Sequence, residues 1–114
     1  MPFSVVITKA GSPSVLKIQE IEMPIPKSQE VCIKVHYAGI NFADTLMRLG
    51  LYRPRPPFPF TPGYELSGVI ESLGPDVTGL EIGQRVVAAM STGGQCSHVS
   101  VNQSRVIPIP VSYT

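Results

Sequence analysis

Proline and glycine constrain this chain more than any other feature of its sequence. They supply 12 and 10 of its 114 residues, and both interrupt regular helices. Their spread along the chain favours short strands joined by turns over a helical bundle. The composition is 43% hydrophobic and 15% charged, which is typical of a folded globular chain. We therefore expect one mainly β (α+β) domain over residues 1–114, with a single modest core.

Alternating hydrophobicity predicts where the strands lie. Residues 30–38 are predicted to form a half-buried strand, whose two faces carry Val31, Ile33, Val35 and Tyr37 on the buried side and Cys32, Lys34 and His36 on the other. Residues 3–9 and 16–22 are predicted to form a hairpin across the turn at 11–13. Further strands are expected at 65–73, 85–89 and 95–101, with turns at 74–76 and at Gly93-Gly94.

One segment breaks the strand pattern and predicts a short helix. Residues 41–48 are good helix formers, and Asn41 is a candidate N-cap. Asp44 lies in the first turn, where a carboxylate meets the positive end of the helix dipole, and Gly50 ends the helix. The loop at 53–63 follows, with five prolines that exclude both helix and central strand. Such a loop is either a binding loop or a stiff connector over the core.

A polar cluster on this helix is the candidate site. Asn41, Asp44 and Arg48 share one face by their spacing, and Tyr52 follows just beyond the helix. The alternative, which spacing alone favours, is an N-cap, an Asp44–Arg48 ion pair and a packed tyrosine.

The cysteines and histidines predict structural roles. Cys32 and Cys96 are far apart in sequence and neither belongs to a Cys-x-x-Cys pair, so a structural zinc site is not expected. We interpret both as small thiols packed on strands. His36 and His98 also lie on predicted strands, without a ligand at metal-binding spacing, and are expected to be hydrogen-bonded structural residues.

Charge and hydropathy exclude several classes of partner. Nine Lys and Arg against eight Asp and Glu leave a net charge of +1, which excludes a strongly basic nucleic-acid binder and a polybasic membrane tether. No apolar run approaches the ~20 residues of a spanning helix, and the first residues do not resemble a signal peptide. We expect a cytoplasmic chain with neither nucleic acid nor membrane as partner.

Several separated motifs occur together in an order that points to a known family. They are Gly39-Ile40-Asn41-Phe42-Ala43-Asp44, Gly50-Leu51-Tyr52, Thr61-Pro62-Gly63-Tyr64-Glu65-Leu66-Ser67-Gly68-Val69-Ile70, Leu73-Gly74 and Ile82-Gly83-Gln84-Arg85-Val86. This pattern resembles the N-terminal half of the medium-chain dehydrogenase/reductase superfamily, and within it the zinc-free NADPH:quinone oxidoreductases, the zeta-crystallin-like branch. The resemblance implies a GroES-like, partly open β-barrel with one short helix after the third strand.

The resemblance also implies a site without metal. Zinc alcohol dehydrogenases carry a Cys where this chain has Asn41, and a Gly-His-Glu where it has Gly63-Tyr64-Glu65. The segment that corresponds to their four-cysteine zinc-binding lobe contains a single cysteine in this chain, Cys96. Zinc polarises an unactivated carbonyl as a Lewis acid, so a zinc-free enzyme needs an acceptor that is already electrophilic. The implied substrate is a quinone or a conjugated enone, whose developing oxyanion hydrogen-bond donors can stabilise.

The family's functional residues map onto the predicted helix. By resemblance, Asn41, Asp44 and Tyr52 line the catalytic cleft, with Arg48 close by. NADPH contacts are expected from the consecutive residues Asn41, Phe42, Ala43, Asp44, Thr45 and Leu46. The branch often carries a tyrosine where this chain has Leu46, which implies a different substrate preference.

The family's second domain, a Rossmann unit with a Gly-rich strand-to-helix turn, has no counterpart in these 114 residues. We therefore expect a fragment that binds NADPH weakly, is inactive alone and self-associates through uncovered apolar surface, and a homodimeric parent. Two other classes remain open. They are a stand-alone GroES-like binding module, such as a co-chaperonin-like ring, and a non-catalytic vesicle-associated relative.

Overall fold

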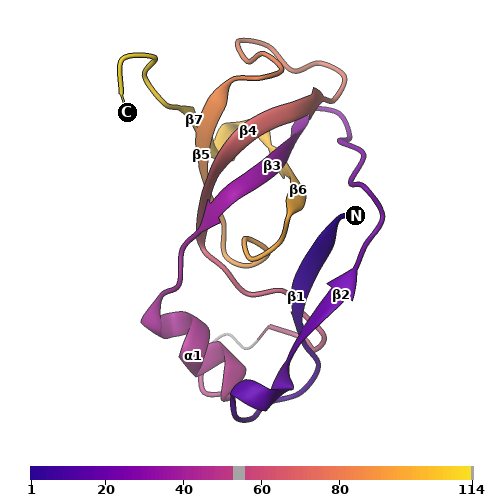
Figure 1. Cartoon of the computed structure of the whole chain (residues 1–114), viewed down its shortest axis with the longest axis vertical. Coiled ribbons are helices and arrows are strands. Elements are labelled where there is room, and N and C mark those ends of the chain that lie inside the picture. The colour runs from indigo at the N-terminus through magenta and orange to yellow at the C-terminus, as the bar shows by residue number, and fades with distance from the viewer. Residues whose placement is uncertain (53–55, 114) are drawn as a thin grey trace.

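The molecule has two structurally different ends (Figure 1). The structure, a computed structural model, describes residues 1–52 and 56–113. A five-stranded sheet forms one end, and the other holds helix α1 (Phe42–Arg48) beside a two-stranded sheet. The predicted mainly β fold, with one α-helix after the third strand, is confirmed. Residues 53–55 of the expected proline loop lie outside the described residues.

The two-stranded sheet is the predicted opening hairpin. β1 (Phe3–Ile7) pairs antiparallel with β2 (Leu16–Glu20), and each strand ends two residues earlier than predicted. A 3₁₀ turn at Pro13–Val15 leads into β2, because proline fixes the backbone at the first position of the turn. Every residue of β2 is exposed. The hairpin therefore buries apolar surface mainly through β1, where Ile7 is 1% exposed.

The large sheet is antiparallel throughout, with strand order β6-β3-β4-β5-β7. Its strands are β3 (Glu30–Ala38), β4 (Glu65–Leu73), β5 (Arg85–Ala89), β6 (His98–Asn102) and β7 (Val106–Pro108). The first three have the predicted bounds. β6 begins three residues later than predicted, because residues 95–97 form backbone hydrogen bonds with β1. β7 was not predicted, because a strand of three residues that ends in proline is too short to show an alternation of apolar and polar residues.

The two faces of β3 differ from the prediction. Tyr37, predicted to face the core, is 78% exposed, whereas Cys32, predicted to face outward, is fully buried. Two register shifts in the pairing with β4, at Cys32/Ile33 and between Val35 and Tyr37, interrupt the alternation. A bulge turns the following side chains to the other face, which explains both errors.

The core lies on the large sheet. Its buried members are aliphatic: Val31, Ile33, Leu66, Ile70, Val86, Ala88, Val101 and Val106. Gly68 lets β3 and β4 approach closely there, because a Cβ at this position would lie 2.2 Å from the carbonyl oxygen of Lys34.

The Gly93-Gly94 segment is not the predicted hairpin turn, because β5 and β6 pair with different strands. It packs instead against residues 61–63. The N–H of Gly93 donates to the carbonyl of Thr61 at 2.7 Å, and that of Gly94 donates to Gly63 at 3.2 Å. Gly63 has a φ of 120° and a Cβ there would lie 2.7 Å from a backbone nitrogen, so only glycine fits. This contact fixes the backbone that leads into Tyr64.

Within residues 1–52 and 56–113, no helix has the combined length and apolarity needed to cross a bilayer.

Candidate functional site

Helix α1 begins as the sequence predicts. The backbone N–H of Asn41 donates to Oδ2 of Asp44 at 2.9 Å, and the N–H of Asp44 donates back to the carbonyl of Asn41 at 3.0 Å. The carboxylate therefore satisfies a free donor and complements the helix dipole. Gly50, with φ of 77°, follows the last turn. The predicted cap at Asn41 and the end near Gly50 are both confirmed.

Arg48 holds the helix to the hairpin. Its Nη1 donates to the carbonyl oxygen of Gly11, and the N–H of Gly11 donates to the carbonyl of Arg48 at 3.0 Å. The predicted Asp44–Arg48 ion pair is wrong, because the guanidinium is directed toward this carbonyl. Asp44 and Arg48 nevertheless line one cavity of about 120 Å³, whereas Asn41, predicted to share their face, does not line it.

Asp44 is buried with an unused acceptor. Its residue is 7% exposed, and its Oδ1 has no hydrogen-bond partner. An unpaired buried carboxylate oxygen is costly unless water or a ligand donates to it. The cavity beside it is also lined by Thr45 and Gln95.

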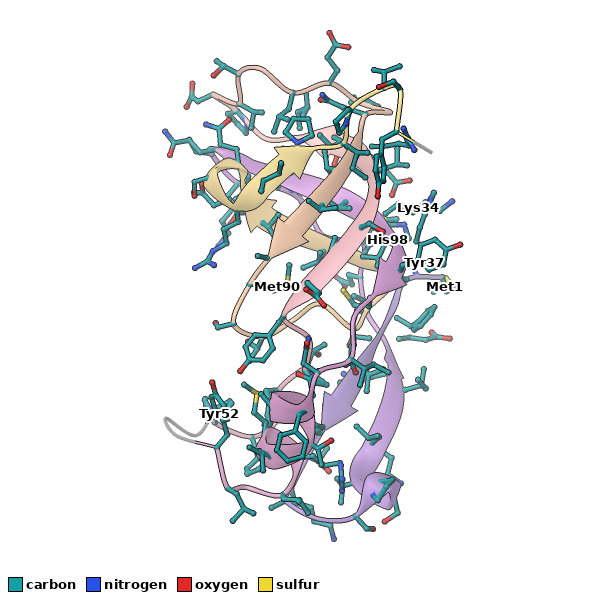
Figure 2. All side chains as sticks on the ribbon, turned by 90° about the vertical axis from the view of Figure 1, so that its left-hand side faces the viewer. Met1, Lys34, Tyr37, Tyr52, Met90 and His98 are labelled. Carbon is teal, nitrogen blue, oxygen red and sulfur yellow. The ribbon has the colours of Figure 1, made fainter. Side chains whose placement is uncertain are left out.

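Tyr52 lies in a second, larger cleft of about 460 Å³, which separates it from Asp44 and Arg48. This cleft is lined by Met47, Tyr52, Pro56, Pro57, Tyr64, Ser91 and Thr92. Figure 2 shows Tyr52 beside α1, on the opposite side of the molecule from Tyr37 and His98. The predicted four-residue cluster is therefore not brought together in one cavity: Asp44 and Arg48 line the smaller one, Tyr52 lines the larger one, and Asn41 lines neither.

Tyr64 lines the same cleft as Tyr52. The hydrogen bond to Tyr52, together with burial and the nearby charge of Asp44, raises the pKa of Tyr64 to about 12. Tyr64 therefore keeps its proton at neutral pH and can act as a donor. Spacing along the sequence did not reveal this pair, because the proline loop separates its members. The resemblance had placed Tyr64 at a former metal position, but without a role.

The stretch expected to contact the cofactor is unevenly exposed. Phe42 is 77% exposed, whereas Asn41, Ala43, Thr45 and Leu46 are half-buried. Ile40, just before the helix, is 83% exposed. This end of the helix thus presents a flat apolar surface next to the buried carboxylate of Asp44.

The cysteines do not form a reactive or ligating centre among the described residues. Cys32 and Cys96 are free thiols, and no three His, Cys, Asp or Glu side chains gather at metal-binding distance within residues 1–52 and 56–113. Burial is the main cause that raises the pKa of both, that of Cys96 to about 11. Cys32 packs on a strand as predicted, while Cys96 lies just before β6.

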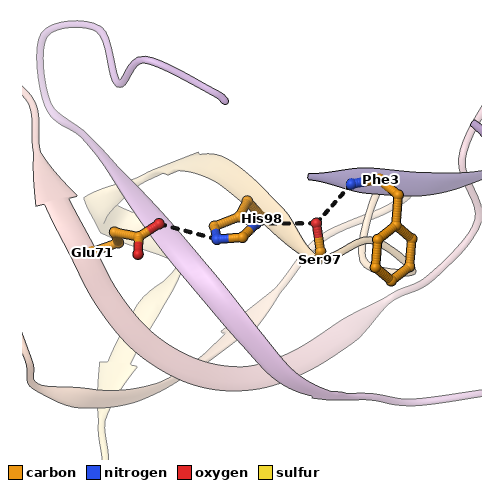
Figure 3. Close-up of polar contacts among 4 residues, drawn as sticks. All are labelled: Phe3, Glu71, Ser97 and His98. Carbon is orange, nitrogen blue, oxygen red and sulfur yellow. Dashed lines mark hydrogen bonds and ion pairs between the residues drawn. The ribbon is translucent and has the colours of Figure 1, made fainter. Parts of the chain in front are cut away.

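A separate polar chain joins β4 to β1 (Figure 3). Glu71 Oε2 lies 3.0 Å from His98 Nε2, Nδ1 lies 3.0 Å from the Ser97 hydroxyl, and that hydroxyl accepts from the N–H of Phe3 at 2.8 Å. The groups are those of a hydrolase triad. However, the N–H of Ser97 is bonded to Phe3 and cannot stabilise an oxyanion. His98 is hydrogen-bonded, as predicted, whereas His36, for which the same was predicted, is exposed.

A cavity of about 490 Å³ lies on the large sheet and is lined mainly by apolar groups such as Val87 and Ile107. None of the predicted site residues lines it. The expected self-association through such a surface stays a prediction.

The sequence comparison identifies relatives for most of the chain. Residues 27–111 match the family described as "Alcohol dehydrogenase GroES-like domain". The chain is 37% identical over 102 residues to the quinone oxidoreductase of Mus musculus, which covers 88% of this chain and 31% of that protein. The chain thus spans about a third of the length of the curated relatives it matches.

Solved structures share the fold. The human synaptic vesicle membrane protein VAT-1 homolog-like protein matches with a TM-score of 0.93 at 34% identity, over 100% of this chain and 37% of its own. Escherichia coli quinone oxidoreductase, solved with NADPH, matches with a TM-score of 0.86 at 29% identity, over 98% and 34%. The expected GroES-like fold is confirmed. The chain belongs to the medium-chain dehydrogenase/reductase superfamily, as an alcohol dehydrogenase GroES-like domain of the quinone oxidoreductase type.

Proposed function

We propose that this chain is the substrate-side domain of an NADPH-dependent oxidoreductase that reduces a quinone or a conjugated enone without zinc. The observation that carries the proposal is the cleft that Tyr52 and Tyr64 both line. Phenol hydroxyls in such a cleft are hydrogen-bond donors for a carbonyl oxygen as negative charge develops on it. A conjugated acceptor needs no more than this, because its own π-system spreads the charge.

The donor chemistry of the residues supports a zinc-free site. A phenol whose pKa is raised to about 12 keeps its proton, whereas zinc takes deprotonated or neutral lone-pair donors such as thiolate, imidazole and carboxylate. Asn41 caps the helix, and an amide is a poor zinc ligand.

The residues around α1 suit a dinucleotide cofactor. The unpartnered Oδ1 of Asp44 needs a donor, and an amide or ribose hydroxyl of NADPH could supply one. The exposed ring of Phe42 offers an apolar contact surface. We propose that Asn41, Phe42, Ala43, Asp44, Thr45 and Leu46 contact the cofactor, with most of its site contributed by the rest of the parent protein. The bound cofactor would supply a hydride.

The chain's own residues then have distinct roles. Tyr52 donates to the acceptor's carbonyl oxygen, while the side chains of Met47 and Pro57 limit the access of water to the cleft. Asp44 and Asn41 fix the start of the helix, and Arg48 fixes its end against Gly11. In this proposal Arg48 acts by holding the helix in place.

The test uses the full-length protein that contains this chain, with NADPH oxidation followed at 340 nm. We expect oxidation with a quinone or a conjugated enone as acceptor, and none with a matched saturated ketone. Tyr52→Phe should lower kcat for the quinone by about tenfold or more. Equal reduction of the saturated ketone, or no reduction of any conjugated acceptor, would refute the proposal.

A vesicle-associated role without catalysis is the second candidate; the likeness to a protein named as a synaptic vesicle membrane protein homolog supports its vesicle-associated part. Fold alone does not separate the two, since one fold hosts many functions. The same assay decides, because a non-catalytic domain would oxidise no NADPH with any acceptor.

A further inference from the structure

A cavity of about 260 Å³, called here the Arg105 cavity, adjoins the cleft that Tyr52 lines. Its polar lining residues are Glu30, Ser91, Thr92, Ser100, Asn102 and Arg105. Ser91 and Thr92 also line the Tyr52 cleft of about 460 Å³, so the two cavities meet at this two-residue segment. None of the site residues expected from the sequence lines the Arg105 cavity, and the proposed function gives it no role.

The backbone holds the segment between the two cavities in place. On one side of residues 91–92, the N–H of Met90 donates to the carbonyl of Tyr64 at 2.7 Å. On the other side, the N–H of Gly93 donates to the carbonyl of Thr61, also at 2.7 Å. The border is therefore a tethered segment that carries a hydroxyl side chain at each of its two positions. A ligand long enough to occupy both cavities would pass these hydroxyls.

Arg105 has unused donors at the far end of this path. It is the last residue of the 3₁₀ turn Gln103–Arg105, which leads into β7. Its Nη1 donates to the carbonyl of Ala89 at 3.4 Å, a long hydrogen bond that uses one of the five N–H donors of a guanidinium. No carboxylate of residues 1–52 and 56–113 forms an ion pair with it. The guanidinium can therefore take a carboxylate from a ligand.

The other polar groups of the cavity have partners that leave donors free. Asn102 accepts through Oδ1 from the N–H of Ser104 at 2.9 Å, so its amide N–H groups stay available. Glu30 is the one carboxylate among the lining residues, and its Oε1 accepts from the N–H of Lys27 at 2.9 Å. An acceptor that is already bonded contributes less to a ligand than a free donor does. The charge of Glu30 still opposes an anion, which gives the test below an effect of opposite sign.

We propose that the Arg105 cavity binds a carboxylate substituent of the quinone or enone whose carbonyl lies in the Tyr52 cleft. Arg105 is then a specificity-determining residue, because its guanidinium pairs with the carboxylate of such a substrate and has no partner on a neutral one. The inference rests on the proposed function, and it narrows the substrate class to acceptors that carry an acidic side chain.

The kinetic test compares a naphthoquinone that carries a short carboxylate side chain with its methyl ester, in the full-length protein that contains this chain. We expect Arg105→Met to raise KM for the carboxylate by about fivefold and KM for the ester by less than about twofold, with kcat unchanged for both. Equal changes in KM for the acid and the ester, or no change for the acid, would overturn the proposal.

Two further variants separate charge from packing. Glu30→Gln keeps an oxygen that can accept from the N–H of Lys27 but removes the negative charge, so KM for the carboxylate should fall by about twofold. Lys17→Met removes one positive charge from the exposed strand β2, away from the cavity, and should change neither KM. A rise in KM for the carboxylate in Glu30→Gln, or a rise in Lys17→Met as large as that in Arg105→Met, would contradict a local ion pair.

A binding measurement decides the inference without turnover. If the full-length protein reduces neither quinone, the proposed function fails, whereas the Arg105 cavity is still tested by titration calorimetry with the same two compounds in the absence of NADPH. We expect Arg105→Met to weaken binding of the carboxylate by about fivefold, and high salt to reduce this difference by screening. Equal Kd values for the wild type and the variant, or no binding of the carboxylate to the wild type, would overturn the inference.

Discussion

The two ends of this molecule differ in the kind of side chain that they bury. In the large sheet, Ile33, Ile70 and Val86 are fully buried among aliphatic neighbours. At the other end, α1 buries Met47 but also the carboxylate of Asp44, and no residue of β2 is buried. An apolar core tolerates few changes, whereas polar cavities cost stability and provide donors and acceptors. The sheet thus supplies the support, and the helix end carries the groups suited to chemistry.

The largest expected effect tests the sheet. Ile70→Ala should lower the free energy of unfolding by about 2–5 kcal/mol, because it leaves a cavity in a fully buried position. Urea unfolding followed by circular dichroism measures this loss. Ile107→Ala is the matched control, since Ile107 is 65% exposed and should change stability by less than about 0.5 kcal/mol. Equal losses in both variants would contradict the assignment of the core.

A smaller effect tests the junction between the helix and the hairpin. Arg48→Met keeps an unbranched side chain but removes the charged donor to Gly11, and should cost about 2 kcal/mol. Lys17→Met on the exposed β2 is the control and should be nearly neutral. The same urea experiment measures both. If Arg48→Met were neutral too, the hydrogen bond to Gly11 would not hold the two elements together.

The smallest effect appears only at high pH, at the contact between the two ends. Cys96 pairs with Ser4 of β1, and burial raises the pKa of its thiol from 9.0 to about 11. The folded state therefore keeps a proton that the unfolded state releases, so this stability is complete below pH 9 and is lost as the pH rises through 11.

By pH 10, about 1 kcal/mol of the unfolding free energy should have been lost through this thiol. Cys96→Ser should therefore flatten the fall in unfolding free energy between pH 8 and pH 10, with Cys32 unchanged as the internal control. An equally steep fall in the variant would show that Cys96 is not buried in this way.

Local signals in the sequence predicted much of the fold. β4, β5 and the capped helix have the predicted bounds. The alternation of apolar and polar residues and the capping residue are local features that the sequence shows directly. The errors arose where distant segments meet. The two bulges of β3 depend on its pairing with β4, and the late start of β6 depends on contacts with β1. Pairings between distant strands cannot be detected from the local pattern of apolar and polar residues.

The candidate site shows the same division. Helical spacing correctly placed Asp44 and Arg48 on one cavity, but it could not reveal that the carbonyl of Gly11, 37 residues away, would take the guanidinium. Nor could it join Tyr52 to Tyr64, since that pair forms only when the chain around the proline loop brings β4 back toward the helix.

In the proposed function, tyrosine hydroxyls rather than a metal activate the acceptor. The most direct test of this claim measures NADPH:quinone turnover by the full-length protein after exhaustive dialysis against a chelator, with zinc quantified by elemental analysis in the same sample. We expect full turnover at substoichiometric zinc. Turnover that disappears on chelation and returns with added Zn²⁺ would contradict it.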